Sequence, residues 1–235
     1  MNRKLTALTL IAAAVLTNAG FTALGSVFNY PDVLKEPTRD ILERFHAHQG
    51  AVAGWFAVLA CSAALFAPIA IGIGKLRSGR FMRLAVPIGI AAAVVQVVGL
   101  SRWPVLAPGF ANDAVGSDPT VARDAVDHFH TLNIVLGTAV GETCGYLLTA
   151  AWTMLVARSL GARFAGRVFP AVGIASGAMI LVGVLSPLEV EAIDLVNFAG
   201  YVVWSVWLVW IAVVLLRSSS SSAEGRALDR AGVAG

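Results

Sequence analysis

The sequence predicts an all-α polytopic membrane protein with six transmembrane helices. The chain of 235 residues is 57% hydrophobic and only 13% charged, and its mean hydropathy of +0.77 is well above that of a soluble domain. Its charged residues gather in short connectors between long apolar stretches. Two pairs of these stretches also resemble each other, so we expect a core four-helix bundle made from a tandem two-helix repeat, with two helices flanking it.

Each apolar stretch is long enough to cross the ~30 Å hydrocarbon core of a bilayer, which takes roughly 20 helical residues. The predicted spans are 5–28, 48–74, 84–107, 131–157, 168–187 and 194–216, in a single transmembrane domain of residues 1–216. Arg3 and Lys4 are typical of a signal peptide, but the apolar run continues to Phe28, which favours an uncleaved first helix. Residues 217–235 contain a serine run with scattered charges and are predicted to be a disordered cytoplasmic tail.

The positions of the basic residues predict the orientation of the chain. Twelve of the 17 lysines and arginines lie before the first span, between spans two and three, between spans four and five, or after the sixth. Such residues are retained on the cytoplasmic side, so we expect a bacterial inner-membrane protein with both termini in the cytoplasm. The other connectors are net acidic and are predicted to face outward. A nucleic-acid partner is excluded because no basic patch with aromatic residues is present.

Residues 45–104 and 129–187 form the predicted repeat, at a spacing of about 84 residues. The recurring segments include Phe45-His46 with Phe129-His130, Arg80-Phe81 with Arg163-Phe164, and Gly89-Ile90-Ala91 with Gly173-Ile174-Ala175. Two spans per unit give both units the same direction, so a pseudo-twofold axis would run along the membrane normal. The alternative interpretation is that two cytoplasmic turns converged on similar residues.

Two of the outer connectors are predicted to be partly helical. In one, Asp118 can cap a helix whose first position is Pro119, and this helix is expected to continue into the fourth span. In the other, residues 38–46 place Ile41, Leu42 and Phe45 on one side. Both segments are expected to lie over the mouth of the bundle.

Glu142 is the ionisable side chain that falls deepest inside a predicted span, where a charge costs roughly 2.5–3.5 kcal/mol to insert. It must therefore face protein or water. Four-residue spacing places Thr138, Glu142 and Tyr146 on one face of the fourth span. Beside them, Gly137, Gly141 and Gly145 form a ridge of small residues. Such a ridge allows the backbone of a neighbouring helix to come close.

Arg102, at the outer end of the third span, is the expected partner of Glu142, because a buried carboxylate without a cation tends to take up a proton. Neutral alternatives are Gln96, Asn18, Asn197 and Tyr201. A different interpretation is that Arg102 reaches the lipid headgroups beside an interfacial Trp103, while a neutral Glu142 bonds between helices.

The four histidines lie at the outer ends of the second and fourth spans. Residues two apart on a helix point roughly 200° from each other, so one histidine of each His-x-His pair can face a common ligand. The repeat nominates His46 and His130, which could bind a haem on both faces or contribute to a zinc or copper site. No third ligand is evident, and wetted or pH-responsive surface groups are the alternative.

Several segments together resemble one protein family. They are Tyr30-Pro31-Asp32, Arg102-Trp103-Pro104, Leu132-Asn133, the run from Gly141 to Ala150, and Trp152-Thr153. They resemble the bacterial membrane proteins called domain of unknown function DUF4386, in which a histidine often stands where this chain has Cys144. The resemblance implies a membrane protein and draws attention to Arg102 and Glu142, but it supplies no substrate.

The function expected from these residues is small-molecule binding or transport, at a polar pocket that opens outward. Its predicted residues are Glu142, Arg102, Thr138, Tyr146, Gln96 and Asn133. Glu142 would take a proton or a cation, and Arg102 would balance its charge. The alternatives are a haem or metal redox protein using His46 and His130, and a noncatalytic sensor or subunit. No phosphate loop, nucleophile elbow or paired-carboxylate motif occurs, so no catalytic residue is predicted and an enzyme is not favoured.

Overall fold

The structure is a computed structural model that describes residues 2–188 and 190–232, with side chains through residue 218. Helices account for nearly all of these residues, and no strand occurs among them. The elements are α1 (Arg3–Phe28), the 3-10 helix η1 (Asp32–Lys35), α2 (Thr38–Ala47), α3 (Gln49–Ala64), α4 (Phe66–Gly74), α5 (Arg80–Val105), α6 (Ala107–Ala114), α7 (Pro119–Leu132), the π-helix η2 (Asn133–Cys144), α8 (Gly145–Leu160), α9 (Ala162–Ala165), α10 (Val168–Val182), the 3-10 helix η3 (Gly183–Leu188) and α11 (Glu191–Gly232).

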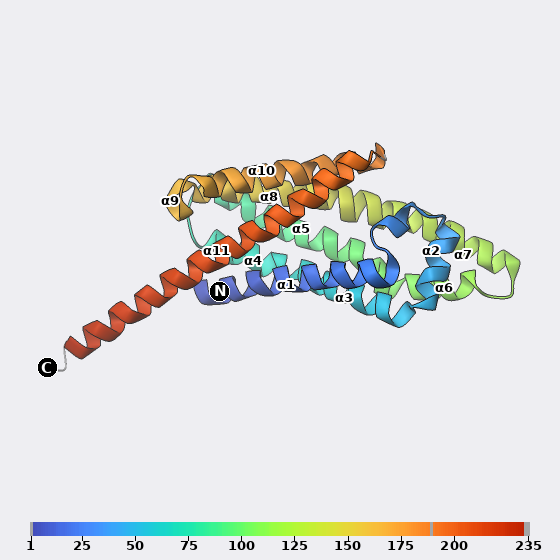
Figure 1. Ribbon diagram of the computed structural model, residues 1–235, viewed down its shortest axis with the longest axis horizontal. Helices are drawn as coiled ribbons and strands as arrows, with labels where there is room; N and C mark the ends of the chain where they lie inside the picture. The colour runs from blue at the N-terminus through green and yellow to red at the C-terminus, as the bar shows by residue number, and fades with distance from the viewer. Residues whose placement is uncertain (1, 189, 233–235) are drawn as a thin grey trace.

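Among the described residues, six helical segments are long and apolar enough to cross a membrane, which confirms the predicted number of spans. They are Arg3–Phe28, Gln49–Gly74, Arg80–Ala114, Pro119–Leu160, Val168–Leu188 and Glu191–Ser218. The N-terminus and the C-terminal part of α11 lie at the same end of the bundle (Figure 1). This agrees with an even number of spans, while the cytoplasmic location of that end stays a prediction.

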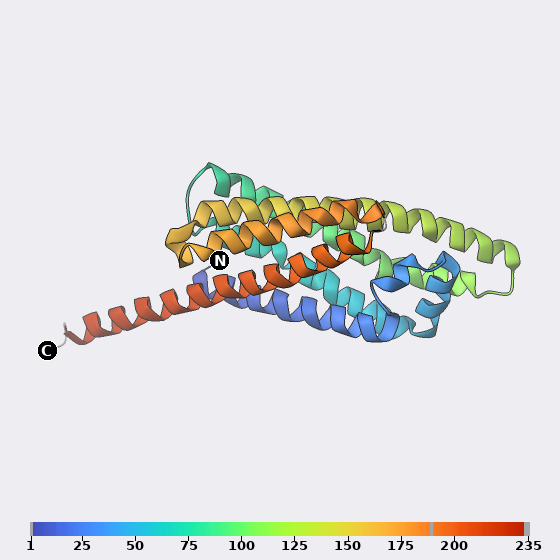
Figure 2. The ribbon, with the colours of Figure 1, turned by 45° about the horizontal axis from the view of Figure 1, so that its top comes forward.

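The six spans run along the bundle (Figures 1 and 2), and their contacts form a ring in chain order. Each span packs against the next one along the chain, and α11 packs against α1. The two helices predicted to flank a four-helix core therefore also touch each other. They close the ring around the interior.

The half of the ring nearest the chain termini is filled with apolar side chains. One cluster of buried residues draws on all six spans and includes Phe66, Trp152, Phe169 and Trp207. The Trp152 ring lies edge to face with Phe66, with 4.7 Å between centroids, and Trp207 stacks on Phe169 at 5.2 Å. We call this region the inner half.

The opposite end carries a helical cap made of η1, α2, α6 and the start of α7 (Figure 1). The structure confirms helices in both outer connectors. Asp118 accepts hydrogen bonds from the backbone N–H groups of Thr120 and Val121, and the helix from Pro119 continues through η2 and α8 to Leu160. The expected apolar face of α2 is also fully packed, with Ile41, Leu42 and Phe45 at most 2% exposed.

Trp103 anchors the cap to the spans. Its side chain is fully buried, and the rings around it are Phe28, Phe45, Phe56 and Phe129, with centroids 4.8 to 5.9 Å away. The interpretation that Trp103 lies at the lipid interface is therefore wrong. The aromatic cluster encloses Trp103 because cap helix α2 and span helices α1, α3 and α7 all contribute a ring to it.

Two glycines that correspond in the predicted repeat occupy similar surroundings. A β-carbon at Gly89 would lie 2.5 Å from Cδ1 of Trp152, and one at Gly173 would lie 2.8 Å from Cε2 of Trp207. In both cases a tryptophan of the following span fills the space left by the missing side chain. The two tryptophans are not counterparts in the repeat, because Trp152 lies within the second unit and Trp207 lies after it, so the repeat stays a prediction.

The last helix differs from its prediction in length. We expected a span of 194–216 followed by a disordered tail, and α11 continues from Glu191 to Gly232. Residues 233–235 lie outside the described residues. Disorder in the tail stays a prediction.

Candidate functional site

The fourth span changes its helical type where the predicted site lies. Residues Asn133–Cys144 are π-helical, with ordinary α-helix on either side. A π-helix bonds residue i to residue i+5, is rare, and frequently occurs at functional sites. The sequence predicts an ordinary helix here. The stretch NIVLGTAVGETC contains two glycines, which lack the side chains that would restrict the backbone.

The glycine ridge of this span faces the third span, as close packing requires. A β-carbon at Gly141 would lie 3.2 Å from the α-carbon of Gly99, and one at Gly99 only 2.6 Å from the α-carbon of Gly141. The two backbones therefore touch. Above and below this contact, Gly137 lies against the Arg102 guanidinium and Gly145 against the Gln96 side chain.

Arg102 is buried in the bundle, with only 4% of its surface exposed. Its Nε donates to Oδ1 of Asn133 at 3.0 Å, its Nη1 donates to the Gly99 carbonyl at 2.6 Å, and its guanidinium lies 5.1 Å from the Trp103 ring. The space that a side chain at residue 137 would need is taken by Nη2. Arg102 thus points inward, and the interpretation that it reaches the headgroups is wrong.

Glu142 lies on the π-helix and is partly buried. Among the residues that the structure describes, its side chain makes neither a hydrogen bond nor an ion pair within 4.0 Å, so the expected direct pair with Arg102 does not form. Asn133 and the Gly99 carbonyl hold the guanidinium instead. Balance of the two charges at longer range stays a prediction.

Tyr30 belongs to the same site, although the sequence does not nominate it. It follows the end of α1, and its ring meets Phe56 edge to face at 5.2 Å. The pKa of Tyr30 is raised to about 12, chiefly because the phenol is buried; the Glu142 charge also raises this pKa, and the Arg102 charge lowers it. Both charged groups therefore act on one phenol. The sequence feature that points to Tyr30 is its place in Tyr30-Pro31-Asp32, one of the segments that resemble the family.

Further polar contacts lie deeper along the same helices. Gln96 donates from Nε2 to Oγ1 of Thr149 at 3.0 Å, and the Trp204 indole donates to Oγ1 of Thr153 at 2.8 Å. The Tyr146 ring packs 6.0 Å from that of Tyr201. These contacts join spans three, four and six below Glu142.

The structure therefore brings the predicted residues together in two groups. Arg102 bonds Asn133 directly, and Gln96 bonds the fully buried Thr149 one level deeper. Tyr146 lies against Gly183 and Tyr201. Thr138 lies on the π-helix and is partly buried. Whether these residues bind a ligand stays a prediction.

The two nominated histidines each bond to a different part of the cap. Nδ1 of His46 lies 3.1 Å from Oδ1 of Asn112, and Nδ1 of His130 lies 3.1 Å from Oγ1 of Thr38. In the part of the chain that the structure describes, no group of three or more metal-binding side chains comes together. The geometry offers a haem or metal no further support.

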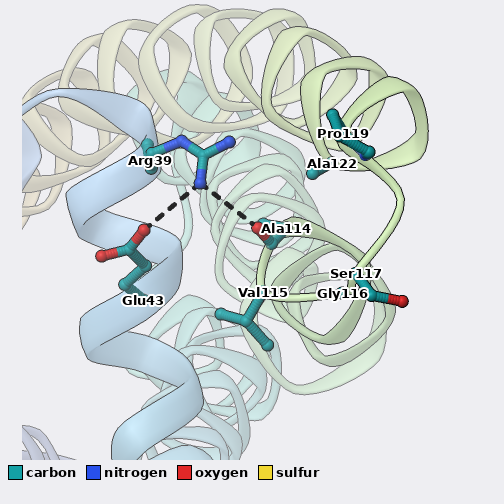
Figure 3. A pocket seen from close by; sticks show the side chains of 8 residues that line it. All are labelled: Arg39, Glu43, Ala114, Val115, Gly116, Ser117, Pro119 and Ala122. Atoms are coloured by element: carbon teal, nitrogen blue, oxygen red, sulfur yellow. Dashed lines mark hydrogen bonds and ion pairs between the residues drawn. The ribbon is translucent and has the colours of Figure 1, made fainter.

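A hollow of about 600 Å³ lies in the cap, between α2 and the link from α6 to α7 (Figure 3). The Arg39 side chain enters it, and its Nη1 donates to Glu43 at 3.4 Å and to the Ala114 carbonyl at 3.5 Å. The hollow is lined by Arg39, Glu43, Ala114, Val115, Gly116, Ser117, Pro119 and Ala122. None of the predicted site residues contributes to it.

An ion pair joins the cap to the last span. Nζ of Lys35, in η1, lies 3.1 Å from a carboxylate oxygen of Asp194 at the start of α11. The hydrogen bond to Asp194 and its charge raise the pKa of Lys35 above the usual value. This contact connects the segment that carries Tyr30 with the sixth span.

Comparison with known proteins adds a family and no activity. A comparison with curated proteins found no match, and a comparison with solved structures found none either. A family model described as "Domain of unknown function (DUF4386)" matches residues 5–212, which include all six spans up to the last turns of the sixth. The resemblance noted in the sequence is therefore confirmed, and the chain belongs to the DUF4386 family of membrane proteins.

Proposed function

We propose that this protein binds a small polar molecule inside the membrane, at a site between Arg102 and Glu142 that opens toward the cap. Binding of this kind fits a transporter-like protein or a membrane receptor for a small solute. The proposal rests on a buried cation that no carboxylate of the described residues neutralises within 4.0 Å.

The proposal depends on the burial of the Arg102 guanidinium among neutral partners. A charged side chain at this depth is costly and is normally kept for function, and a buried charge is usually paired. Here the guanidinium is only 4% exposed, and its partners are the neutral Asn133 amide and the Gly99 carbonyl. A bound molecule with a negative group would complete the charge balance at this position.

The packing of the inner half supports an outward opening. The apolar cluster around Trp152 and Trp207 draws on all six spans and fills the half of the ring nearest the chain termini. A polar molecule would therefore reach Arg102 from the cap side.

Glu142 is proposed to take a proton or a cation when the site is filled. It lies on the same span as Asn133, which holds Arg102, and it has no hydrogen-bond partner among the described residues. A carboxylate in this position can change its protonation state at a smaller cost in lost contacts. Binding of the molecule would therefore be coupled to uptake or release of a proton by Glu142.

Small molecules that stay bound through purification test the proposal. Wild-type protein, Arg102→Lys and Glu142→Gln are purified from the same membranes and denatured, and the released compounds are compared by mass spectrometry. We expect at least one compound at near-equal amounts to the wild-type protein and several-fold less in each variant. Arg102→Lys keeps the buried charge and removes the planar fork that binds an anion through two N–H groups.

Two exposed residues of α2 supply matched controls. Glu43→Gln and Arg44→Lys make the same chemical changes on side chains that are 50% and 41% exposed, and they should release the same compound as the wild type. The proposal is wrong if folded Arg102→Lys and Glu142→Gln release the same compounds as their controls, in the same amounts.

A further inference from the structure

One nitrogen of the Arg102 guanidinium, Nη2, donates no hydrogen bond to the described residues. Nε and Nη1 bond Asn133 and the Gly99 carbonyl. Nη2 lies over Gly137, and no acceptor for it occurs among the described residues. A guanidinium binds carboxylate and phosphate groups through parallel N–H donors. The free side of Arg102 is therefore suited to an anionic group.

The carboxylate of Glu142 lacks a hydrogen-bond donor among the described residues. A carboxylate is an acceptor only, and no described residue donates a hydrogen bond to it. An ammonium group carries three donors on a compact charge. Glu142 is thus suited to the cationic end of a ligand.

The π-helix brings these two groups to the same side of the fourth span. In an α-helix, residues five apart point about 140° away from each other. In η2 the bonding of residue i to i+5 places Glu142 one turn from Gly137, and Gly137 is the residue on which the Arg102 guanidinium rests. Both charges also act on the phenol of Tyr30. Glu142 therefore lies one π-helical turn from the residue that supports the Arg102 guanidinium.

We infer that the ligand is a zwitterion, with an anionic group on Nη2 of Arg102 and an ammonium on the carboxylate of Glu142. This inference rests on the proposed function and names the class of its ligand. A molecule with both charges brings no net charge into the membrane interior, because its own two charges cancel. Each of its ends would in addition be paired with one residue of opposite charge. A free amino acid and a lipid headgroup that contains an amine and a phosphate share this chemistry.

A series of soluble probes separates the two charges. Glycine, β-alanine, 4-aminobutanoate and 6-aminohexanoate are titrated into the purified protein by calorimetry, beside butanoate and butylamine, which each keep one charge. We expect the best amino acid to bind roughly tenfold tighter or more than either single-charge analogue. The best chain length reports the distance between the two residues.

Variants assign each end of the ligand. Glu142→Gln should remove the preference for the amino acid over the matching acid, while it leaves binding of the acid unchanged. Arg102→Lys should weaken both the amino acid and the acid and leave the amine unchanged. These opposite patterns do not arise from general damage to the fold, which would weaken all three probes together.

A lipid source is tested in nanodiscs made of phosphatidylethanolamine or of phosphatidylglycerol, which has the phosphate and lacks the amine. If the headgroup is the ligand, phosphatidylethanolamine stays bound to the wild type in native mass spectrometry and is lost from both variants. The inference is overturned if neither the amino acids nor this lipid bind, or if acids bind as tightly as amino acids. The proposed function is judged separately, because a released anion that depends on Arg102 alone would support it and still overturn the zwitterion.

Discussion

The inner half of the bundle differs in its packing from the half nearer the cap, which we call the outer half, although the same spans form both. In the inner half, glycines make room for tryptophans, as Gly89 does for Trp152, and the interior is apolar. In the outer half, glycines make room for polar groups, as Gly137 does for the guanidinium of Arg102. The comparison teaches that small residues alone do not mark a site. The side chain that fills the space they leave decides whether the region is a structural core or a binding site.

The closest backbone contact lies in the outer half, so the largest effect is expected from Gly99→Leu. Its β-carbon would overlap the α-carbon of Gly141, which as backbone cannot turn away. We expect almost no folded protein in size-exclusion chromatography after detergent extraction. The matched control is Gly54→Leu, where no atom lies within 4 Å of the new β-carbon, and its yield should equal that of the wild type. Equal yields of the two variants would contradict the close contact of spans three and four.

Removal of a core side chain tests the inner half. Trp152→Ala should lower the free energy of unfolding by about 3–5 kcal/mol, because it leaves a cavity among tightly packed neighbours. The measurement is reversible unfolding in mixed micelles. Leu84→Ala, at a position that is 55% exposed, should cost far less. If Trp152→Ala also abolished the compounds released by the wild type while the protein stayed folded, the separation of the two halves would be wrong.

A smaller loss is expected when the support of Arg102 is removed. Asn133→Ala deletes the acceptor that Nε uses, and a hydrogen bond to a charged group contributes about 1.5–3 kcal/mol. The same unfolding measurement should show this loss. Thr131→Ala lies two residues away on an exposed position and serves as the control. A cost no greater than that of Thr131→Ala would show that the Asn133 contact does not fix the guanidinium.

The smallest effect is expected at the ion pair between the cap and the last span. Lys35→Gln should cost less than about 1 kcal/mol, because both partners are exposed to water. The pair raises the pKa of Lys35, so its contribution is complete below the ordinary lysine pKa and disappears as the pH rises through the raised value. A double-mutant cycle with Asp194→Asn, at pH 8 and at pH 12, checks the sign. Equal coupling at both pH values would contradict it.

Much of the fold follows from the sequence because membrane insertion depends on composition that can be read locally. The segregation of charges predicts six spans, and Asp118 with Pro119 predicts the start of α7, as observed. The closure of the ring by α1 and α11 could not be predicted, because contacts between the ends of a chain leave no local pattern. The π-helix was also missed, since i+5 bonding depends on neighbouring spans as well as on the residues themselves.

The candidate site was only partly predictable for a similar reason. The depth of Glu142 and the positions of Arg102 and Asn133 follow from spacing, and the last two do bond each other. The expectation that Arg102 pairs with Glu142 rests on their opposite charges alone. Charge does not reveal that Gly99 and Asn133 are near enough to hold the guanidinium first. Tyr30 lies outside the spans and joins the site only through the fold of the connector that follows α1.

The most direct test of the central claim is an experimental structure of the protein, extracted from its own membrane with no ligand added. The account predicts density for a small molecule that contacts Nη2 of Arg102 and the carboxylate of Glu142, in the half of the bundle nearer the cap. A Glu142 carboxylate bonded directly to Arg102, with no further molecule between the third and fourth spans, would contradict it.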